Sequence, residues 1–162
     1  MKDVNEPTDQ EVQAWAEFRY QIRIWNGIAE RAAREVGLAP QHQQVLLALG
    51  GFPGSEPPRI VDLAERMQLQ HHSMVGLLDR MQHERLIIRE TRTDGRGVSI
   101  LMTEAGEQKL QAALAILRPK LRSAATELIA ALSQLAGQAA GDPTTQDSQR
   151  TGNKVGARTI AR

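Results

Sequence analysis

The stretch that decides the fold is residues 60–106, which read IVDLAERMQLQHHSMVGLLDRMQHERLIIRETRTDGRGVSILMTEAG. In its first half, apolar residues recur at steps of three and four, which is the spacing of one buried face of a helix. They form two groups, Ile60–Met67 and Met74–Met81. We therefore predict two short helices, the second from about His71 to Glu84, joined by a tight turn that buries Leu69. Two such helices make a helix-turn-helix.

The second half of the stretch changes to the alternation that is typical of β-strands. Apolar residues occupy positions 86–88 and then 98, 100 and 102, and Asp94-Gly95 between them accepts the positive φ angles of a hairpin turn. Four arginines, at positions 85, 89, 92 and 96, outnumber Glu90 and Asp94 and give this hairpin a local charge of +2. A basic hairpin directly after a helix-turn-helix is the layout of a winged helix.

Before this stretch, the sequence predicts two further helices. The first is amphipathic and runs from about Asp9 to Val36. Thr8 and Glu11 have the spacing of a capping box at its start, and the glycine after Val36 can take the left-handed conformation at its end. The second helix covers residues 41–49, and the glycines and prolines of residues 50–58 then break regular structure.

After the hairpin, Thr103 is placed to cap a long helix with an apolar seam. Pro119 lies within this seam, so we expect a kink or a break near Ala115–Pro119, and the pattern ends at Gly137. The seam consists of Leu110, Leu114, Leu117, Leu121, Ala125, Leu128, Leu132 and Leu135. Because a small domain cannot cover two long apolar stripes internally, we expect the first and last helices to pair with a second copy of the chain. Residues 141–162 are mildly basic and poor in large apolar side chains, which predicts a disordered tail.

The composition excludes several classes of protein. The chain has 162 residues, about the size of one domain, and 41% are hydrophobic, which is enough for a buried core. The longest apolar run, Ala112–Leu117, is far shorter than the roughly 20 residues of a membrane-spanning helix, so we expect a cytoplasmic protein without a membrane partner. The absence of cysteine excludes disulfides and thiolate metal sites. Because the net charge is only +1, any attraction to DNA must come from the local arrangement of charges.

No enzyme motif is present in the sequence. It has no G-x-G-x-x-G after a strand, no Walker A lysine, no G-x-S-x-G and no H-E-x-x-H, so we expect neither a catalytic residue nor a cofactor. A metal site is the alternative at His71 and His72, or at Asp79 with His83, whose spacing brings two ligands onto one helical turn. Since dense ligand clusters are lacking, exposed or DNA-facing histidines are the favoured interpretation, and no metal is expected.

Three runs of residues in this order resemble the MarR family of bacterial transcription regulators. They are DLAERM at 62–67, SMVGLLDRM at 73–81 and the wing pattern D-x-R…T-x-x-G formed by Asp94, Arg96, Thr103 and Gly106. The flanking helices match the family's dimerisation elements, so the resemblance covers roughly residues 10–137. It implies a domain over residues 1–140, with dimerisation helices at 10–37 and 104–137 and a DNA-binding lobe at about 41–103.

The resemblance implies a homodimer that represses transcription and is released from double-stranded DNA by a small-molecule effector. The paired second helices of the motif would enter successive major grooves of a pseudo-palindromic operator, and the wings would reach the flanking minor grooves. Polar side chains and free N–H groups at the start of that helix can meet base edges and phosphates, and wing arginines suit the minor groove. The expected DNA contacts are His71, His72, Ser73, Val75, Gly76, Arg80, Arg92, Asp94 and Arg96, with Arg92 on a phosphate and Asp94 bracing Arg96 or the turn.

Two sites depart from the pattern of the family. Val75 and Gly76 stand where the family commonly has a small hydroxyl residue and often an arginine, so base reading there is apolar, against a thymine methyl, or absent. Arg59 stands where a capping hydroxyl usually precedes the first helix of the motif, which weakens the start signal of that helix.

Aromatic residues on the first helix are candidates for an effector pocket, because the family often binds small aromatic acids between its dimer helices and its DNA-binding lobes. Tyr20 lies off the apolar stripe and is the better candidate for the wall of a pocket that takes an aromatic or phenolic effector, with Arg19 or Arg23 as partner of a carboxylate. The others follow the stripe, which favours packing in the core or an interface. They are Trp15, Phe18 and Trp25.

A second hypothesis is a winged-helix protein-interaction module without specific DNA binding, in which the second helix of the motif docks on a protein partner. Salt-sensitive binding to duplex DNA distinguishes the two hypotheses, because only phosphate contacts release counterions.

Overall fold

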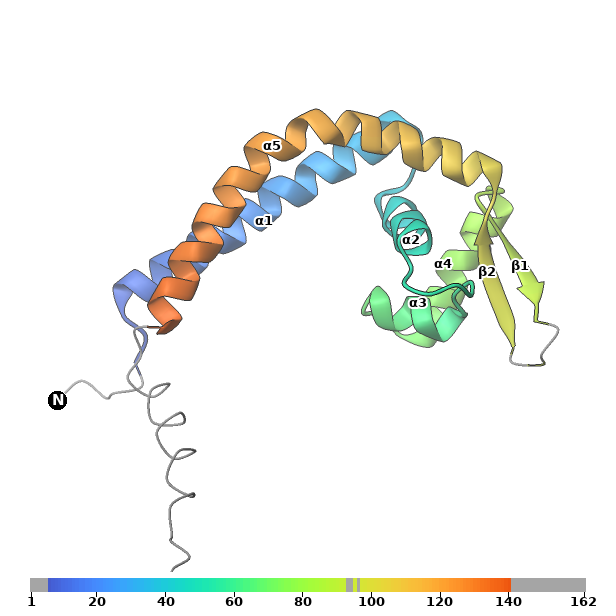
Figure 1. Cartoon of the computed structure of the whole chain (residues 1–162), viewed down its shortest axis with the longest axis horizontal. Helices are drawn as coiled ribbons and strands as arrows, with labels where there is room; N and C mark the ends of the chain where they lie inside the picture. Colours follow the sequence, from blue (N-terminus) through green and yellow to red (C-terminus); the bar gives the residue numbers. More distant parts are fainter. Residues whose placement is uncertain (1–5, 93–94, 96, 141–162) are drawn as a thin grey trace, which may run out of the picture. The chain divides into compact units, whose positions relative to one another are not determined.

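The computed structural model describes residues 6–92, 95 and 97–140 (Figure 1). Its elements are α1 (Asp9–Glu35), α2 (Pro40–Gly50), α3 (Ile60–Arg66), α4 (His71–His83), β1 (Ile87–Thr91), β2 (Val98–Met102) and α5 (Glu104–Ala140). This order confirms the predicted mainly helical fold, in which a helix-turn-helix formed by α3 and α4 is followed by a two-stranded wing. The predicted disordered tail at 141–162 lies outside the described residues and stays a prediction.

The chain divides into two compact units. The central unit is Asn26–Arg122, and the terminal unit is Met1–Trp25 with Ser123–Arg162. The core of the central unit consists of the apolar faces that the sequence predicts, with α4 contributing the largest share. Its fully buried members include Val45, Leu46, Leu63, Met74, Leu77, Leu78, Met81, Ile87 and Ile100. Because burying one such side chain contributes roughly 1.5–3 kcal/mol, this packing determines which face of α4 is exposed.

Three helices of the central unit end in the same hydrogen-bond pattern. The residue after each helix or its last turn has a positive φ angle: Gly37 after α1 (70°), Gln68 after α3 (53°) and Arg85 after α4 (57°). The next residue is each time a leucine, Leu38, Leu69 or Leu86, whose N–H donates to a carbonyl five residues earlier at 2.9 Å. This is the Schellman motif, in which the following apolar residue packs back on the helix. Leu38 and Leu86 are buried, whereas Leu69 is only half-buried against the core.

The wing is an antiparallel pair in which Ile87 lies opposite Met102 and Thr91 opposite Val98. Residues 92–97 join the strands, and the N–H of Arg92 donates to the carbonyl of Gly97 at 2.9 Å. Gly95 has the positive φ that the sequence predicts for the turn, at 72°, whereas its neighbour Asp94 lies outside the described residues.

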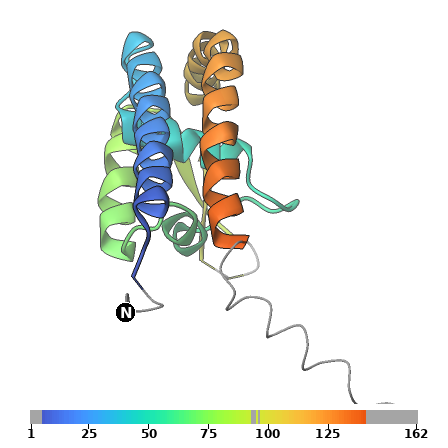
Figure 2. The same cartoon turned by 90° about the vertical axis from the view of Figure 1, so that its left-hand side faces the viewer.

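Thr103 caps α5, as its position predicts. Its Oγ1 accepts the N–H of Gly106 at 3.1 Å and donates to the carbonyl of Arg85 at 2.7 Å, which links the start of α5 to the end of α4. The helix then continues without interruption through Pro119 and past Gly137 (Figures 1 and 2). Of the kink or break predicted near Ala115–Pro119, the break is wrong, as is the predicted end at Gly137, because neither residue alone cancels the hydrogen bonds and packing of the many other residues of so long a helix. The kink stays a prediction.

The terminal unit leaves much of its apolar surface exposed. Thr8 and Glu11 form the predicted capping box at the start of α1, with N–H to side-chain oxygen distances of 2.6 and 3.2 Å. Ala14 of α1 and Ala131 of α5 are buried, but Trp15 is 55% exposed and Ile129 is 63% exposed. Trp15 thus does not lie in the core of a single chain, and its ring makes an edge contact with Phe18.

Candidate nucleic-acid interface

The exposed face of α4 carries the residues predicted to read DNA. His71, His72, Ser73 and Arg80 are exposed, and Val75 and Gly76 are partly so. The N-cap residue, Gln70, makes no side-chain cap hydrogen bond, and the first turn holds no acidic residue. The first N–H groups of α4 are therefore available to an acceptor from outside the helix, such as a phosphate oxygen.

Arg89 of β1 fixes the middle of α4 from the side. Its Nη1 forms an ion pair with Asp79 at 2.7 Å, and its Nη2 donates to the carbonyl of Val75 at 3.3 Å. The Nε of Arg89 is buried and has no hydrogen-bond partner among the residues that the structure describes. The sequence counts Arg89 in the basic patch of the wing, but the structure directs its guanidinium to α4, so this cation orients the helix.

A second polar contact fixes the carboxyl end of α4. Nδ1 of His42, a side chain of α2 that is only 5% exposed, lies 3.0 Å from Oε2 of Glu84, the C-cap residue of α4. Sequence reasoning missed this pair, because 42 residues separate the partners and neither belongs to a motif.

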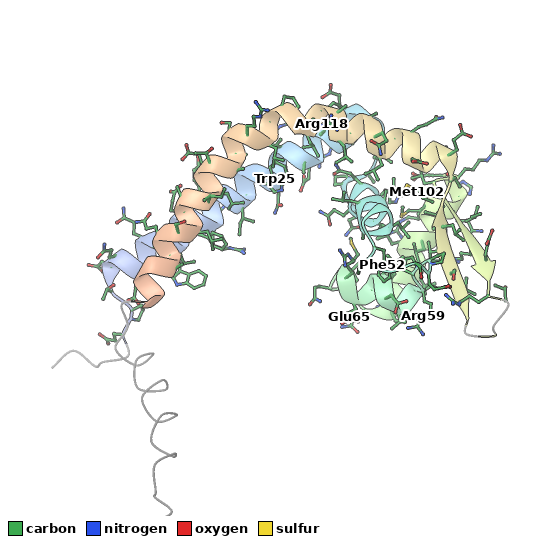
Figure 3. All side chains as sticks on the ribbon, viewed as in Figure 1. Trp25, Phe52, Arg59, Glu65, Met102 and Arg118 are labelled. Atoms are coloured by element: carbon green, nitrogen blue, oxygen red, sulfur yellow. The ribbon has the colours of Figure 1, made fainter. Side chains whose placement is uncertain are left out.

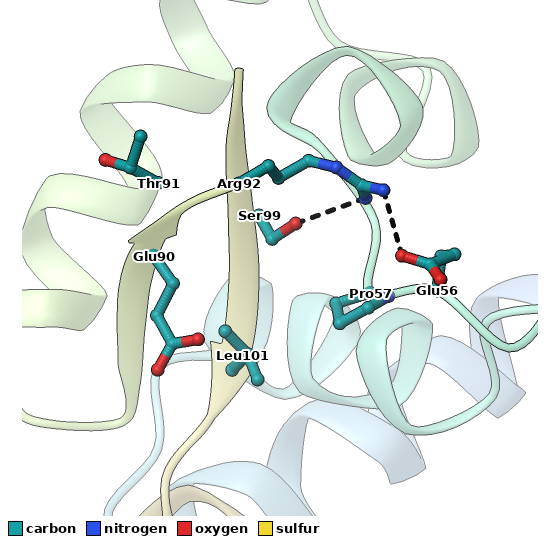
Figure 4. Close-up of a pocket in the computed structure, with 7 residues that line it drawn as sticks. All are labelled: Glu56, Pro57, Glu90, Thr91, Arg92, Ser99 and Leu101. Carbon is teal, nitrogen blue, oxygen red and sulfur yellow. Dashed lines mark hydrogen bonds and ion pairs between the residues drawn. The ribbon is translucent and has the colours of Figure 1, made fainter. Parts of the chain in front are cut away.

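In the wing, the structure places Arg92 against other residues of the protein. Its side chain is 17% exposed and pairs with Glu56, from the segment between α2 and α3, at 2.9 Å (Figure 4). Asp94 and Arg96, the other two predicted contacts of the wing, lie outside the described residues.

Arg59, labelled in Figure 3, and Asp62 define the start of α3, in place of the missing capping hydroxyl. The Asp62 carboxylate accepts the backbone N–H of Arg59 at 2.8 Å and two hydrogen bonds from its guanidinium at 3.0 and 2.9 Å. The side-chain hydrogen bond from Arg59 lowers the pKa of Asp62 below its ordinary value, against the opposing effect of burial. The helix is thus capped by the third residue inside it.

This pair predicts a pH-dependent contribution to stability. Asp62→Asn should lower the free energy of unfolding at neutral pH by less than about 1 kcal/mol, the range of partly exposed ion pairs. Because the pKa of Asp62 is lowered in the folded state, the contribution is present above the ordinary pKa and is lost as the pH falls below about 4. Urea unfolding of both proteins across this range measures it, with Glu65→Gln, an exposed acid of the same helix, as control. A difference that persists unchanged at acid pH contradicts the prediction.

The predicted effector residues lie on α1 in the terminal unit. Arg19, Tyr20 and Arg23 are all exposed, Tyr20 by 50%. The central unit has cavities of about 270 to 370 Å³, which are lined by other residues. In the described part of the chain, no three His, Asp or Glu residues gather as ligands of a metal ion. None of the described helices combines the length and the apolar character that crossing a lipid bilayer requires.

Known proteins share this arrangement. Residues 36–97 match the model of the MarR family. AbsC, a MarR family transcriptional regulator from Streptomyces coelicolor, is 25% identical with a TM-score of 0.63, over 85% of this chain and 99% of that one. A mutant of S. aureus MepR bound to an oligodeoxyribonucleotide is 17% identical with a TM-score of 0.57, over 82% and 94% of the two chains. M. tuberculosis MosR in complex with DNA is 22% identical with a TM-score of 0.53, over 74% and 94%. No curated protein matches the chain.

The fold and the exposed face of α4 together define a winged helix-turn-helix protein. The family match covers α2, α3, α4 and β1, the elements that hold and present the exposed face of α4. This part of the chain matches the MarR family, in agreement with the resemblance that the sequence motifs indicate.

Proposed function

We propose that the protein is a sequence-specific DNA-binding regulator of transcription that acts as a repressor. The observation that carries the proposal is the exposed, uncapped start of α4 on a helix whose opposite face is buried in a MarR family core. Short polar side chains and unpaired N–H groups at a helix start are suited to base edges and phosphates. The DNA-bound structures of MepR and MosR support the proposal, because both share this fold.

Within this proposal, α4 enters the major groove and the wing follows the adjacent backbone or minor groove. The residues proposed to contact DNA from α4 are His71, His72, Ser73, Val75, Gly76 and Arg80. From the tip of the wing, Arg96 contacts the minor groove, and Asp94 braces it.

The proposed form of the protein is a homodimer that binds a pseudo-palindromic operator. The exposed apolar side chains of the terminal unit support this form, since large apolar side chains left in water favour burial in an interface. They are Val12, Trp15, Tyr20, Ile129 and Leu132, each at least half exposed in the single chain. A dimer also presents two copies of α4, which matches the two-fold symmetry of a palindromic site.

An effector is proposed to release the dimer from DNA. A small aromatic or phenolic molecule that binds better to a state with displaced α4 helices shifts the protein toward that state, by no more than its difference in affinity for the two states. The phenol of Tyr20 and the guanidinium groups of Arg19 and Arg23 are the candidate contacts on α1. Their chemistry suits an aromatic carboxylate.

The alternative is a protein-interaction module in which α4 docks on a protein partner. Selection of bound sites from random duplexes at a stated salt concentration tests both functions, since a palindromic consensus supports the regulator and indifference to duplex DNA supports the module.

Arg96→Ala should weaken duplex binding about tenfold, because an arginine in a groove contributes roughly 1–3 kcal/mol. The slope of log affinity against log salt should become shallower by up to about one unit. Fluorescence anisotropy at several salt concentrations measures both quantities. Arg118→Ala, an exposed arginine of α5 (Figure 3), removes the same charge outside the wing and should change neither. A flat salt dependence of the unaltered protein contradicts the DNA-binding proposal itself.

A further inference from the structure

Arg92 joins the base of the wing to the segment that leads into the helix-turn-helix. Its Nη2 donates to Oε2 of Glu56 at 2.9 Å, and its Nη1 donates to Oγ of Ser99 at 3.4 Å (Figure 4). Glu56 precedes α3, Arg92 directly follows β1, and Ser99 belongs to β2. The guanidinium of Arg92 therefore connects the wing to the segment that leads into α3, and most of the surface of this side chain is covered.

The backbone of the same segment also holds the wing, and among the described residues it does so at β2. The N–H of Ile100 donates to the carbonyl of Pro58 at 2.9 Å, and Arg59 forms an isolated antiparallel bridge with Ser99. A cavity of about 370 Å³ separates the segment from the end of β1. Its lining is Glu56, Pro57, Glu90, Thr91, Arg92, Ser99 and Leu101. The Arg92 side chain spans this gap.

The charge of Arg92 also acts on the first turn of α3. The pKa of Asp62 is lowered mainly by the hydrogen bond from Arg59, and to a smaller extent by the positive charge of Arg92. Glu56, Arg59, Asp62 and Arg92 thus form one group of alternating charges at the junction of the wing and the helix-turn-helix.

We propose that the Glu56–Arg92 ion pair is a strut that sets the position of the wing relative to α3 and α4. Arg92 is a positioning residue for DNA binding, since its guanidinium donates to Glu56 and Ser99 and most of its side chain is covered. This assignment differs from the phosphate contact that the sequence predicts for Arg92. It rests on the proposed DNA-binding function, because its main readout is the affinity for duplex DNA.

Glu56→Gln separates the two roles of Arg92. Glu56 is itself 71% exposed, so the neutral amide leaves the core intact. If Arg92 is a strut, the variant should bind duplex DNA about two- to fivefold more weakly, the factor expected for loss of a partly exposed ion pair, with an unchanged salt slope. If Arg92 contacts phosphate, removing Glu56 frees the cation and removes a negative charge, so binding should tighten, and that result overturns the proposal.

A double-mutant cycle completes the test. Arg92→Gln alone should cost about as much affinity as Glu56→Gln, and the double variant no more than either, because the two changes break one interaction. Additive losses overturn the proposal. Glu90→Gln is the matched control: it removes the same charge from the same cavity, at an exposed side chain that makes no ion pair within the described part of the chain.

If the unaltered protein binds no duplex DNA, that result contradicts the proposed function but not the strut. The strut can then be tested by a measurement without DNA. The N–H of Arg92 donates to Gly97 at the base of the wing, so its hydrogen exchange reports the order of this region. Glu56→Gln should accelerate exchange at this amide severalfold, while Glu90→Gln should not. Equal exchange in Glu56→Gln and in the unaltered protein overturns the strut.

Discussion

Replacing Gly106 with alanine is expected to destabilise the protein by about 1–3 kcal/mol, the usual cost of overpacking a tight core. A Cβ at this position overlaps the carbonyl oxygen of Leu86 and lies 3.0 Å from Cγ of Met102 and 3.2 Å from a methyl group of Leu46. The carbonyl cannot easily move away, because it accepts the N–H of Thr103 and belongs to the leucine that terminates α4. Thermal unfolding followed by circular dichroism measures the effect as a lower Tm.

Gly137→Ala is the matched control for this prediction. Gly137 lies in the same helix, and a Cβ there meets no atom within 4 Å. Since alanine is the better helix former by up to about 1 kcal/mol, this variant should keep or raise the Tm. Equal melting of the two variants contradicts the steric argument. The T-x-x-G motif of the wing pattern thereby gains a physical meaning: Thr103 caps α5, and Gly106 permits the close approach of α5 to the carbonyl of Leu86.

Replacing Ile129 with aspartate is expected to convert the proposed dimer to monomers and to lower duplex affinity at least about a hundredfold, because the two half-sites are then no longer bound together. Ile129 is 63% exposed in the single chain, the largest exposure among the big apolar residues that the structure describes, so a charge there costs the isolated fold little. In an apolar interface between two chains, the same charge is buried without a partner, which is costly. Sedimentation equilibrium measures the first effect, and anisotropy the second.

Gln134→Asp provides the control, since it introduces the same charge at an exposed polar position of the same helix. It should leave both the mass in solution and the affinity unchanged. A monomeric Ile129→Asp variant that binds an operator as tightly as the unaltered protein contradicts the dimer proposal. So does an unaltered protein that sediments as a monomer while it binds DNA.

The sequence predicted the elements of the central unit because local signals there agree with one another. The apolar spacing of α4, the proline that opens α2 and the glycine after α1 each act over a few residues, and the structure confirms them. The ends of α3 and α4 were harder to predict from the sequence, since Gln68 and Arg85 have positive φ angles although neither is a glycine. Each of these residues is followed by a leucine that packs against the core, and this packing offsets the strain of the positive φ angle. Helix propensity alone does not reveal such an ending.

The candidate site was predictable in its exposed half only. A sequence shows that α4 has a polar face, but it does not show which charges turn inward. Arg89 and Arg92 count as wing cations by position, yet their partners Asp79 and Glu56 lie on other elements and become visible only after folding. The same holds for His42 and Glu84. Long-range pairs of this kind hold α4 and the wing in place, and no sequence motif indicates them.

The repeated leucine endings of α1, α3 and α4 have a consequence for how this protein can evolve. Because Leu69 precedes α4 and Leu86 follows it, the boundaries of that helix depend on side chains that face the interior. Its length is therefore independent of the outward residues. For the proposed DNA-binding role, substitutions on the exposed face of α4 can therefore change the specificity without changing the length of the helix or the core that holds it.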